Sequence, residues 1–149
     1  MKLYSMNKES ALLEFYGWIE PAQSYFEAAV SSNMSVYPKG ALSYLQMAAE
    51  FAFKAAIVSI GGKPTRSRSP YVLSTRCRRL VPKLEVSAQL YSPSKRKLLS
   101  FLDPAFYAEA GKGARLPVAS EWKQLVYLVK QLLRVMESLC RKRIDALFR

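Results

Sequence analysis

The stretch of sequence that decides the fold reads AEFAFKAAIVSIGGKP, residues 49–64. Small and apolar residues recur at helical spacing through this stretch and upstream of it. Pro38 is typical of a first helical turn, and Gly61-Gly62 ends the pattern. We therefore predict a long helix from Pro38 to the Gly-Gly turn, at the centre of a helical bundle or of a dimer interface, because alanines allow close helix packing. The residues on its predicted packing side are Ala41, Leu45, Ala48, Ala52, Ala55 and Ala56.

Helical patterns also precede this stretch. An apolar stripe at helical spacing predicts a first helix from about Lys8 to Ser31, with Asn7 as its N-cap. Pro21 lies inside it, and a proline there removes a backbone hydrogen bond and clashes with the preceding turn. We therefore expect Pro21 to kink this helix or to split it in two.

Further helices are predicted downstream. A cap followed by proline marks a helix start, and this signal occurs at Ser69-Pro70, Ser92-Pro93 and Asp103-Pro104. The first of these helices should run to about Val81. The last helix should begin near Ser120 and reach Leu147, because apolar residues between them follow spacings of three and four. No stretch alternates convincingly like a strand, so we predict one all-α domain over residues 1–149, an up-and-down helical bundle of four main helices plus short helices.

Composition limits the class of protein. The chain has 149 residues and half of them are hydrophobic, which fits one domain with a proper core. It lacks an uncharged apolar run of about 18 residues and a signal-like N-terminus, so we expect a cytoplasmic protein without a membrane helix. Histidine is absent and the only cysteines are Cys77 and Cys140. We expect no zinc site and no cofactor, and a disulfide between the two cysteines stays open.

Positive charge is concentrated in the middle of the chain. The net charge is +12, from 23 basic and 11 acidic residues. Residues 61–97 carry ten basic side chains and only Glu85 opposes them, whereas residues 1–60 carry four basic and five acidic ones. Such a local excess predicts a surface patch that attracts anions, with a solvated face that has no partner as the alternative.

The basic stretch supplies the candidate ligand site. Arginine forks match phosphate oxygens in bidentate geometry, and Tyr71 and Tyr91 lie near enough in sequence to stack on bases. We predict that a phosphate-bearing ligand contacts Lys63, Arg66, Arg68, Arg76 and Arg79. A second basic cluster, Arg141-Lys142-Arg143, is the next candidate, although cations are also favoured at a helix C-terminus for reasons of stability alone.

One polar pair lies on the predicted second helix. Glu50 and Lys54 are four residues apart, so their side chains share one face. They form either a weak ion pair on the surface, or a polar pair that faces a cleft or a dimer seam. The second alternative adds Glu50 and Lys54 to the candidate ligand-binding residues.

Three segments together resemble the HEPN domain family, the higher eukaryote and prokaryote nucleotide-binding domain. They are AEFAFKA at residues 49–55, the GGKP turn at 61–64, and ARLP at 114–117 before the long last helix. The resemblance covers roughly Glu14 to Leu139. It implies a helical bundle that dimerises. It further implies an RNase of toxin–antitoxin type, a partner of a nucleotidyltransferase, or a nucleotide-binding protein.

The sequence departs from this family at the RNase motif. Family RNases use an arginine and a following histidine, R-x(4–6)-H, and this chain has no histidine. The nearest spacing, Arg134 to Cys140, replaces the imidazole by a thiol that titrates poorly near neutral pH. We therefore predict no catalytic residues. From the family resemblance and the small-residue side of the second helix, we predict a homodimer that binds a nucleotide or RNA. The alternatives are an interaction subunit that partners a nucleotidyltransferase, and a diverged RNase.

Overall fold

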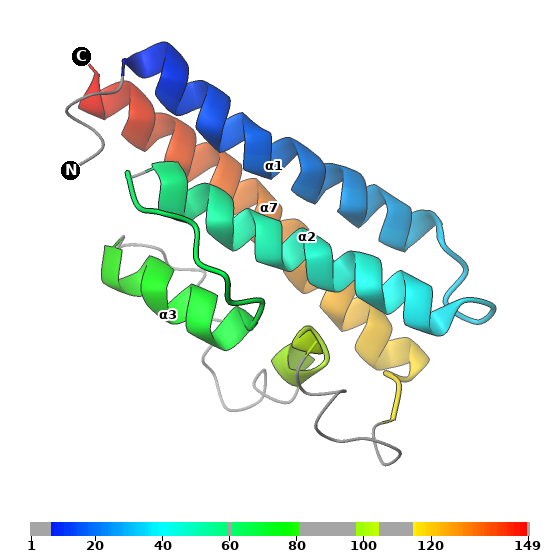
Figure 1. Ribbon diagram of the computed structural model, residues 1–149. Coiled ribbons are helices and arrows are strands. Elements are labelled where there is room, and N and C mark those ends of the chain that lie inside the picture. Colours follow the sequence, from blue (N-terminus) through cyan, green and yellow to red (C-terminus); the bar gives the residue numbers. More distant parts are fainter. Residues whose placement is uncertain (1–6, 60, 81–97, 105–114, 149) are drawn as a thin grey trace.

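The computed structural model describes residues 7–59, 61–80, 98–104 and 115–148, apart from the side chains of 78–80. Four long helices account for most of these residues (Figure 1). They are α1 (Lys8–Ser31), α2 (Pro38–Ser59), α3 (Pro70–Leu80) and α7 (Ala119–Leu147), and a short helical turn occupies residues 98–100. The described ranges contain no strand, so the predicted all-α bundle is confirmed.

Helix α1 begins where the sequence predicts and is not split. The Asn7 side chain accepts a hydrogen bond of 2.8 Å from the Ser10 backbone N–H. The expectation that Pro21 divides the helix is wrong, because α1 is one continuous element through it. The residue whose carbonyl faces the proline ring is Gly17, one turn earlier. That glycine is exposed, and no atom lies within 4 Å of where a Cβ would be.

Helix α2 lies at the centre of the bundle. It packs against α1, α3 and α7, and 15 of its 22 residues are buried. The alanines of its predicted packing side are all fully buried inside this single chain. The bundle alternative is therefore confirmed. The same small-residue face is not available to a second protomer, so a homodimer would have to use another surface.

The Gly-Gly turn ends α2 as predicted. Gly61 has a φ of 81°, a conformation that favours glycine, and the Gly62 N–H donates to the Ile57 carbonyl over 3.0 Å. A Cβ on Gly62 would lie 2.8 Å from both the Ile57 carbonyl oxygen and its side chain. The turn therefore needs glycine at both positions, for conformation at one and for close approach at the other.

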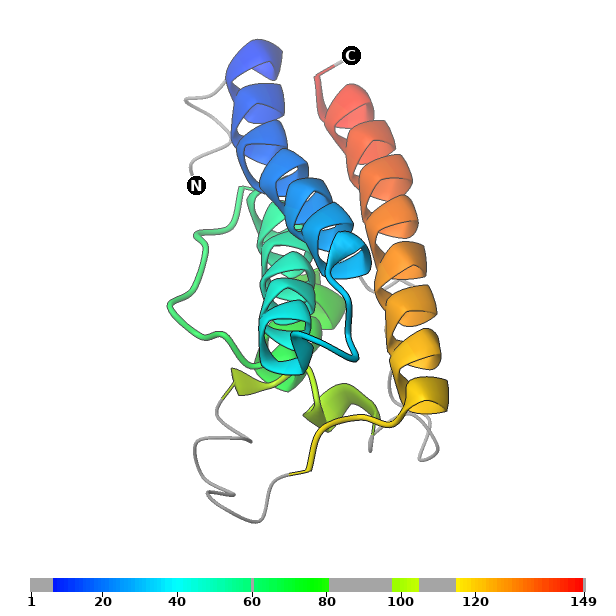
Figure 2. The same ribbon diagram turned by 90° about the vertical axis from the view of Figure 1, so that its right-hand side faces the viewer.

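Helix α7 runs antiparallel to α1 (Figures 1 and 2). Lys8 at the start of α1 pairs with Asp145 near the end of α7 at 3.0 Å, and Gln23 donates to Glu137 at 3.0 Å. Helix α2 is likewise antiparallel to α1, after the short connection at residues 32–37. The predicted bounds of α7 hold within one residue, and its predicted apolar face is packed against α1 and α2.

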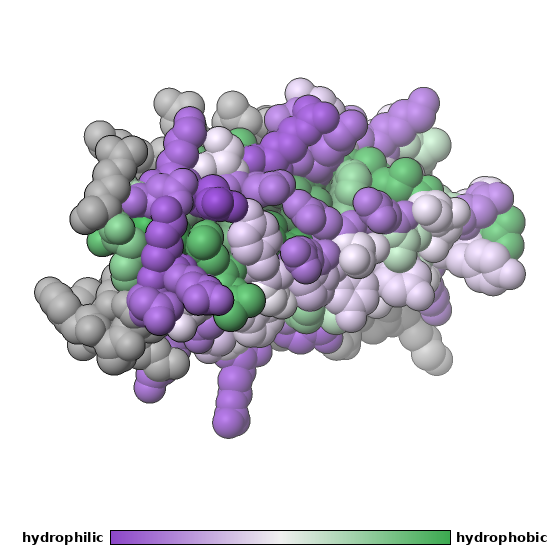
Figure 3. All heavy atoms as spheres, turned by 90° about the horizontal axis from the view of Figure 1, so that it is seen from above, coloured by the Kyte–Doolittle hydropathy of each residue, from purple (hydrophilic) through white to green (hydrophobic). Residues whose placement is uncertain are grey.

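Helix α2 is the one described helix whose length and apolar composition would suit a membrane span. Most of its apolar window, 78%, is buried inside the bundle, which is what a core helix requires. Seen from above, the described surface of the bundle is largely hydrophilic, with apolar atoms visible between the polar side chains (Figure 3). The apolar composition of α2 is explained by its buried position at the centre of the bundle.

Some predictions concern parts of the chain that lie outside the described residues. These are the helix start at Ser92-Pro93, most of the helix after Asp103-Pro104, and the positions of Glu85 and Tyr91. Helix α3 does begin at Pro70, as predicted from Ser69-Pro70.

Candidate functional site

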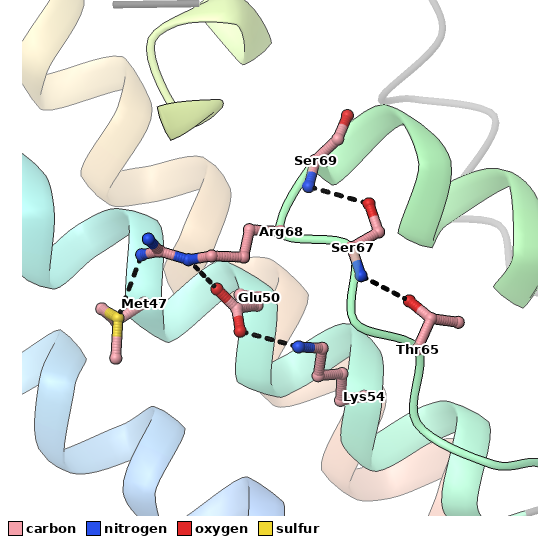
Figure 4. A network of polar contacts seen from close by, with 7 residues as sticks. All are labelled: Met47, Glu50, Lys54, Thr65, Ser67, Arg68 and Ser69. Carbon is pink, nitrogen blue, oxygen red and sulfur yellow. Dashed lines mark hydrogen bonds and ion pairs between the residues drawn. The ribbon is translucent and has the colours of Figure 1, made fainter. Parts of the chain in front are cut away.

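A buried carboxylate on α2 holds two cations (Figure 4). Glu50 Oε2 accepts a hydrogen bond of 2.8 Å from Lys54 Nζ, and Glu50 Oε1 accepts another of 2.8 Å from Arg68 Nε. The side chains of Glu50 and Lys54 are only 7% and 8% exposed. The surface ion pair that was one prediction for Glu50 and Lys54 is therefore wrong. The two form a buried polar pair, in which each charge depends on its partner.

Arg68 fastens the loop between α2 and α3 onto α2. Its Nη2 also approaches Met47 Sδ at 3.3 Å, so the guanidinium contacts α2 at two points (Figure 4). Within the loop, the Ser67 N–H donates to Thr65 Oγ1 and the Ser69 N–H to Ser67 Oγ, both at 3.2 Å. We call Glu50, Lys54 and Arg68 the loop latch.

An aromatic cluster lines the other side of the latch lysine. Lys54 Nζ lies 5.8 Å from the ring centroid of Trp18 on α1, within the range of a cation–π contact. The Trp18 ring meets Phe51 edge to face, with centroids 5.2 Å apart. The latch thus links three segments, because Lys54 also contacts α1 while Arg68 comes from the loop.

Three of the other predicted ligand residues lie at the surface. Lys63, Arg66 and Arg76 are exposed, and Arg76 Nη2 donates to the Lys63 carbonyl at 3.3 Å. That bond brings the start of the loop beside α3. Arg79 lies on α3, but its side chain is outside the described part of the structure. Of the four predicted cations whose side chains the structure describes, Lys63, Arg66 and Arg76 are exposed without an ion pair, whereas Arg68 is half-exposed and paired with Glu50.

The two cysteines are buried free thiols. Cys77 Sγ donates to the Phe53 carbonyl at 3.4 Å, and burial raises the pKa of Cys77 to about 12, with the nearby Cys140 adding to the rise. Burial also raises the pKa of Cys140, although a hydrogen bond with Ser59 acts in the opposite direction. Arg134 is exposed, so it and the buried Cys140 lie on different sides of α7. This geometry does not suit a catalytic arginine–base pair.

Arg141, in the second basic cluster, contacts one residue of α1 and one of α7. Arg141 Nη1 donates to the Tyr16 hydroxyl at 2.6 Å, and its Nε lies 3.7 Å from Asp145. The last turn of α7 contains no basic residue, so the cluster is not placed to stabilise the helix C-terminus. The contact with α1 belongs to Arg141, whereas Lys142 and Arg143 are exposed.

A polar contact at the start of α7 was also not predicted from the sequence. Arg115, in the ARLP segment, forms a bidentate pair with Glu121 at 2.6 and 2.9 Å, and Glu121 Oε1 accepts from the Val118 N–H at 3.0 Å. The pair thereby fixes the start of α7. An acidic residue at the third helical position, after an arginine in the preceding loop, was the signal that could have revealed it.

The protein is an all-α bundle whose central helix, α2, carries the buried pair Glu50 and Lys54 one turn apart. The model of the HEPN domain matches residues 15–141. Since that match covers most of the chain, the protein belongs to the HEPN domain family. No curated protein and no solved structure matches the chain. Among the described residues, no group of three or more acidic or thiol side chains is placed to hold a metal ion.

Proposed function

We propose that this HEPN-domain protein binds a phosphate-bearing ligand, a nucleotide or RNA, at the surface beside the loop latch. The observation that supports this most is the exposure of Lys63, Arg66 and Arg76 around one loop. None of these three side chains forms an ion pair with any residue that the structure describes. An anion can therefore approach them without displacing a carboxylate.

The loop latch has a supporting role in this proposal. Arg68 Nε donates its hydrogen bond to Glu50, but the Arg68 side chain is still 49% exposed. A phosphate can thus contact the outer edge of the same guanidinium, while Glu50 and Lys54 keep it in place. Arg79 belongs to the proposed site through its spacing of three residues from Arg76 on α3.

Binding without catalysis is the form of function that fits these residues. The chain has no histidine, and the Cys140 thiol is buried with a raised pKa. A cytoplasmic location is consistent with two free thiols. If the protein is a homodimer, it associates through a surface other than the alanines of α2.

The test is equilibrium binding of a fluorescent ATP and a labelled oligouridylate at low and high salt. Replacing Lys63, Arg66 and Arg76 together by glutamine should abolish nucleotide binding, with helicity unchanged. The matched control, Lys39→Gln with Lys142→Gln and Arg143→Gln, removes three charges elsewhere and should retain it. Unchanged affinity for ATP in the loop variant would contradict the proposed site, and ATP affinity lost in the control would move the site to the Arg141–Arg143 cluster.

A partnered function is the second candidate. Val36, Tyr37 and Tyr44 are 57%, 66% and 41% exposed around the start of α2, and exposed apolar side chains that gather in one place favour a protein contact. The partner in this proposal is a nucleotidyltransferase. Failure to bind nucleotide or RNA at low salt, with association to such an enzyme that Tyr37→Ser weakens, would favour this candidate over ligand binding.

A further inference from the structure

The outward face of α7 carries a second basic surface. Lys123, Tyr127, Lys130 and Arg134 follow one another at spacings of four, three and four residues, so they form one stripe along the helix. All four are exposed, and Tyr127 is 64% exposed. The buried face of the same helix is turned toward α1 and α2, and it consists of Leu125, Val129, Leu132, Leu133, Met136, Cys140 and Ile144. We call the four exposed residues the α7 stripe.

The acidic residues of α7 and the cations of the α7 stripe differ in what they contact. The acidic residues are used in contacts with the rest of the chain: Glu121 with Arg115, Glu137 with Gln23, and Asp145 with Lys8. By contrast, no cation of the α7 stripe is paired with a carboxylate in the described ranges. The three cations of the stripe are therefore exposed and without an ion pair among the described residues, around one exposed aromatic ring. Glu137, three residues beyond Arg134 on the same side of the helix, has Gln23 as its partner.

The α7 stripe is separate from the loop surface. In the side view, α7 lies on one side of α2 and the loop at residues 61–69 on the other (Figure 2). A small ligand bound to Lys63 and Arg66 would therefore not reach Tyr127. Whatever binds to the stripe has to be considered independently of the proposed function.

We infer that the α7 stripe binds a single strand of nucleic acid, with phosphates at Lys123, Lys130 and Arg134 and a base stacked on Tyr127. Cations that follow a backbone, together with an exposed aromatic ring between them, are how single strands are held without sequence preference. The stripe spans 12 residues from Lys123 to Arg134, and the eleven steps between them cover about 16 Å at 1.5 Å per residue, which accommodates a strand of a few nucleotides.

The same features disfavour a protein as the occupant. Lysine is depleted in the buried centre of protein interfaces, and two of the four stripe residues are lysines. The stripe offers one aromatic ring and no neighbouring aliphatic side chain within it, so it supplies little apolar area for a protein partner. A flexible chain of phosphates needs only cations and a stacking surface, and it can follow a convex helix.

The test is fluorescence anisotropy of labelled ten-nucleotide oligouridylate and oligothymidylate with the full chain. The variant Lys123→Gln/Lys130→Gln/Arg134→Gln should weaken binding at least about tenfold. Because each neutralised phosphate of a single strand contributes about 0.7 to the salt slope, its slope should fall by about 2. Tyr127→Ala keeps the net charge and should weaken binding about 5-fold or more, through loss of stacking.

Two controls separate this inference from general charge attraction and from the loop surface. The variant Lys39→Gln/Lys142→Gln/Arg143→Gln has the same net charge as the stripe variant and should bind within about twofold of the parent. The variant Lys63→Gln/Arg66→Gln/Arg76→Gln should still bind the strand, and adding Tyr127→Ala to it should weaken that binding as it does in the parent. Equal losses in the stripe variant and the charge control, or no effect of Tyr127→Ala, would overturn the inference. Similar affinity for both oligonucleotides would identify the phosphate chain and base stacking, not the sugar, as what is recognised.

Discussion

Helices α2 and α7 are both long and central to the fold, but α2 buries a pair of charged side chains whereas α7 exposes its cations. Helix α2 buries 15 of its 22 residues, and its two charged residues in the buried part, Glu50 and Lys54, are inside the protein as a pair. Helix α7 buries 7 of its 29 residues and exposes its cations. Charge in the buried part of α2 therefore belongs to the stability of the bundle, whereas the cations of α7 lie at the surface. Four changes to these side chains and their neighbours test that difference.

Removing the carboxylate of α2 should have the largest effect. Glu50→Ala leaves the Lys54 ammonium buried without its partner, which should lower the free energy of unfolding by about 3–5 kcal/mol. Urea denaturation followed by circular dichroism measures this change. The matched change on α7, Glu137→Ala, removes an exposed carboxylate and should cost less than about 1 kcal/mol. Equal losses in the two variants would contradict the distinction between the helices.

A second variant separates lost charge from lost packing at the same place. Glu50→Leu combined with Lys54→Met replaces the pair by apolar side chains of similar size. Such replacements of buried pairs are often neutral or stabilising, so this double variant should recover most of the stability that Glu50→Ala loses. It should also release Arg68, since the loop latch is gone, and faster proteolysis within residues 61–69 would show the release.

Apolar truncation should show a smaller contrast between the helices. Leu45 on α2 is fully buried, whereas Leu139 on α7 is 36% exposed. Leu45→Ala should lower the free energy of unfolding by about 2–5 kcal/mol, through lost burial and a cavity. Leu139→Ala should cost less than about 1 kcal/mol. A thermal unfolding scan of both variants measures the difference, and a cost at Leu139 equal to that at Leu45 would show that both faces of α7 are packed.

The smallest effect should come from the thiol that lies between these elements. Burial raises the pKa of Cys77 from 9.0 to about 12, so the folded protein holds the thiol proton more tightly than the unfolded chain does. Its contribution to stability is present below pH 9.0 and is lost as the pH rises toward about 12. The free energy of unfolding should fall across this range, and less steeply in Cys77→Ala. Equal slopes in both proteins would assign the loss to other groups.

The bundle could be predicted because its signals are local. Helix starts at Asn7, Pro38 and Pro70, and the stop at Gly61-Gly62, depend on backbone groups within a few residues. The split that was one expectation at Pro21 is wrong for the same reason. A proline weakens an isolated helix, but the packing of α1 on α2 and α7 keeps this one continuous.

The candidate site could be predicted only in part. The sequence places cations in the loop, but the pairing of Arg68 with Glu50 joins residues 18 positions apart, and no local pattern reveals it. The burial of Glu50 and Lys54 depends on what covers them, which spacing along one helix does not determine. The α7 stripe differs from these buried contacts, because the spacing of its residues can be read from the sequence. What the sequence does not show is that all four side chains are exposed.

The ion pair between Lys8 and Asp145 has a mechanical consequence. It joins the start of α1 to the end of α7, and the two helices run antiparallel from that point. A force that pulls residues 7 and 148 apart would therefore act across the helix pair and not along it. Contacts would then open one after another from this end, so the bundle should yield at a lower force than it would if the same helices were sheared lengthwise.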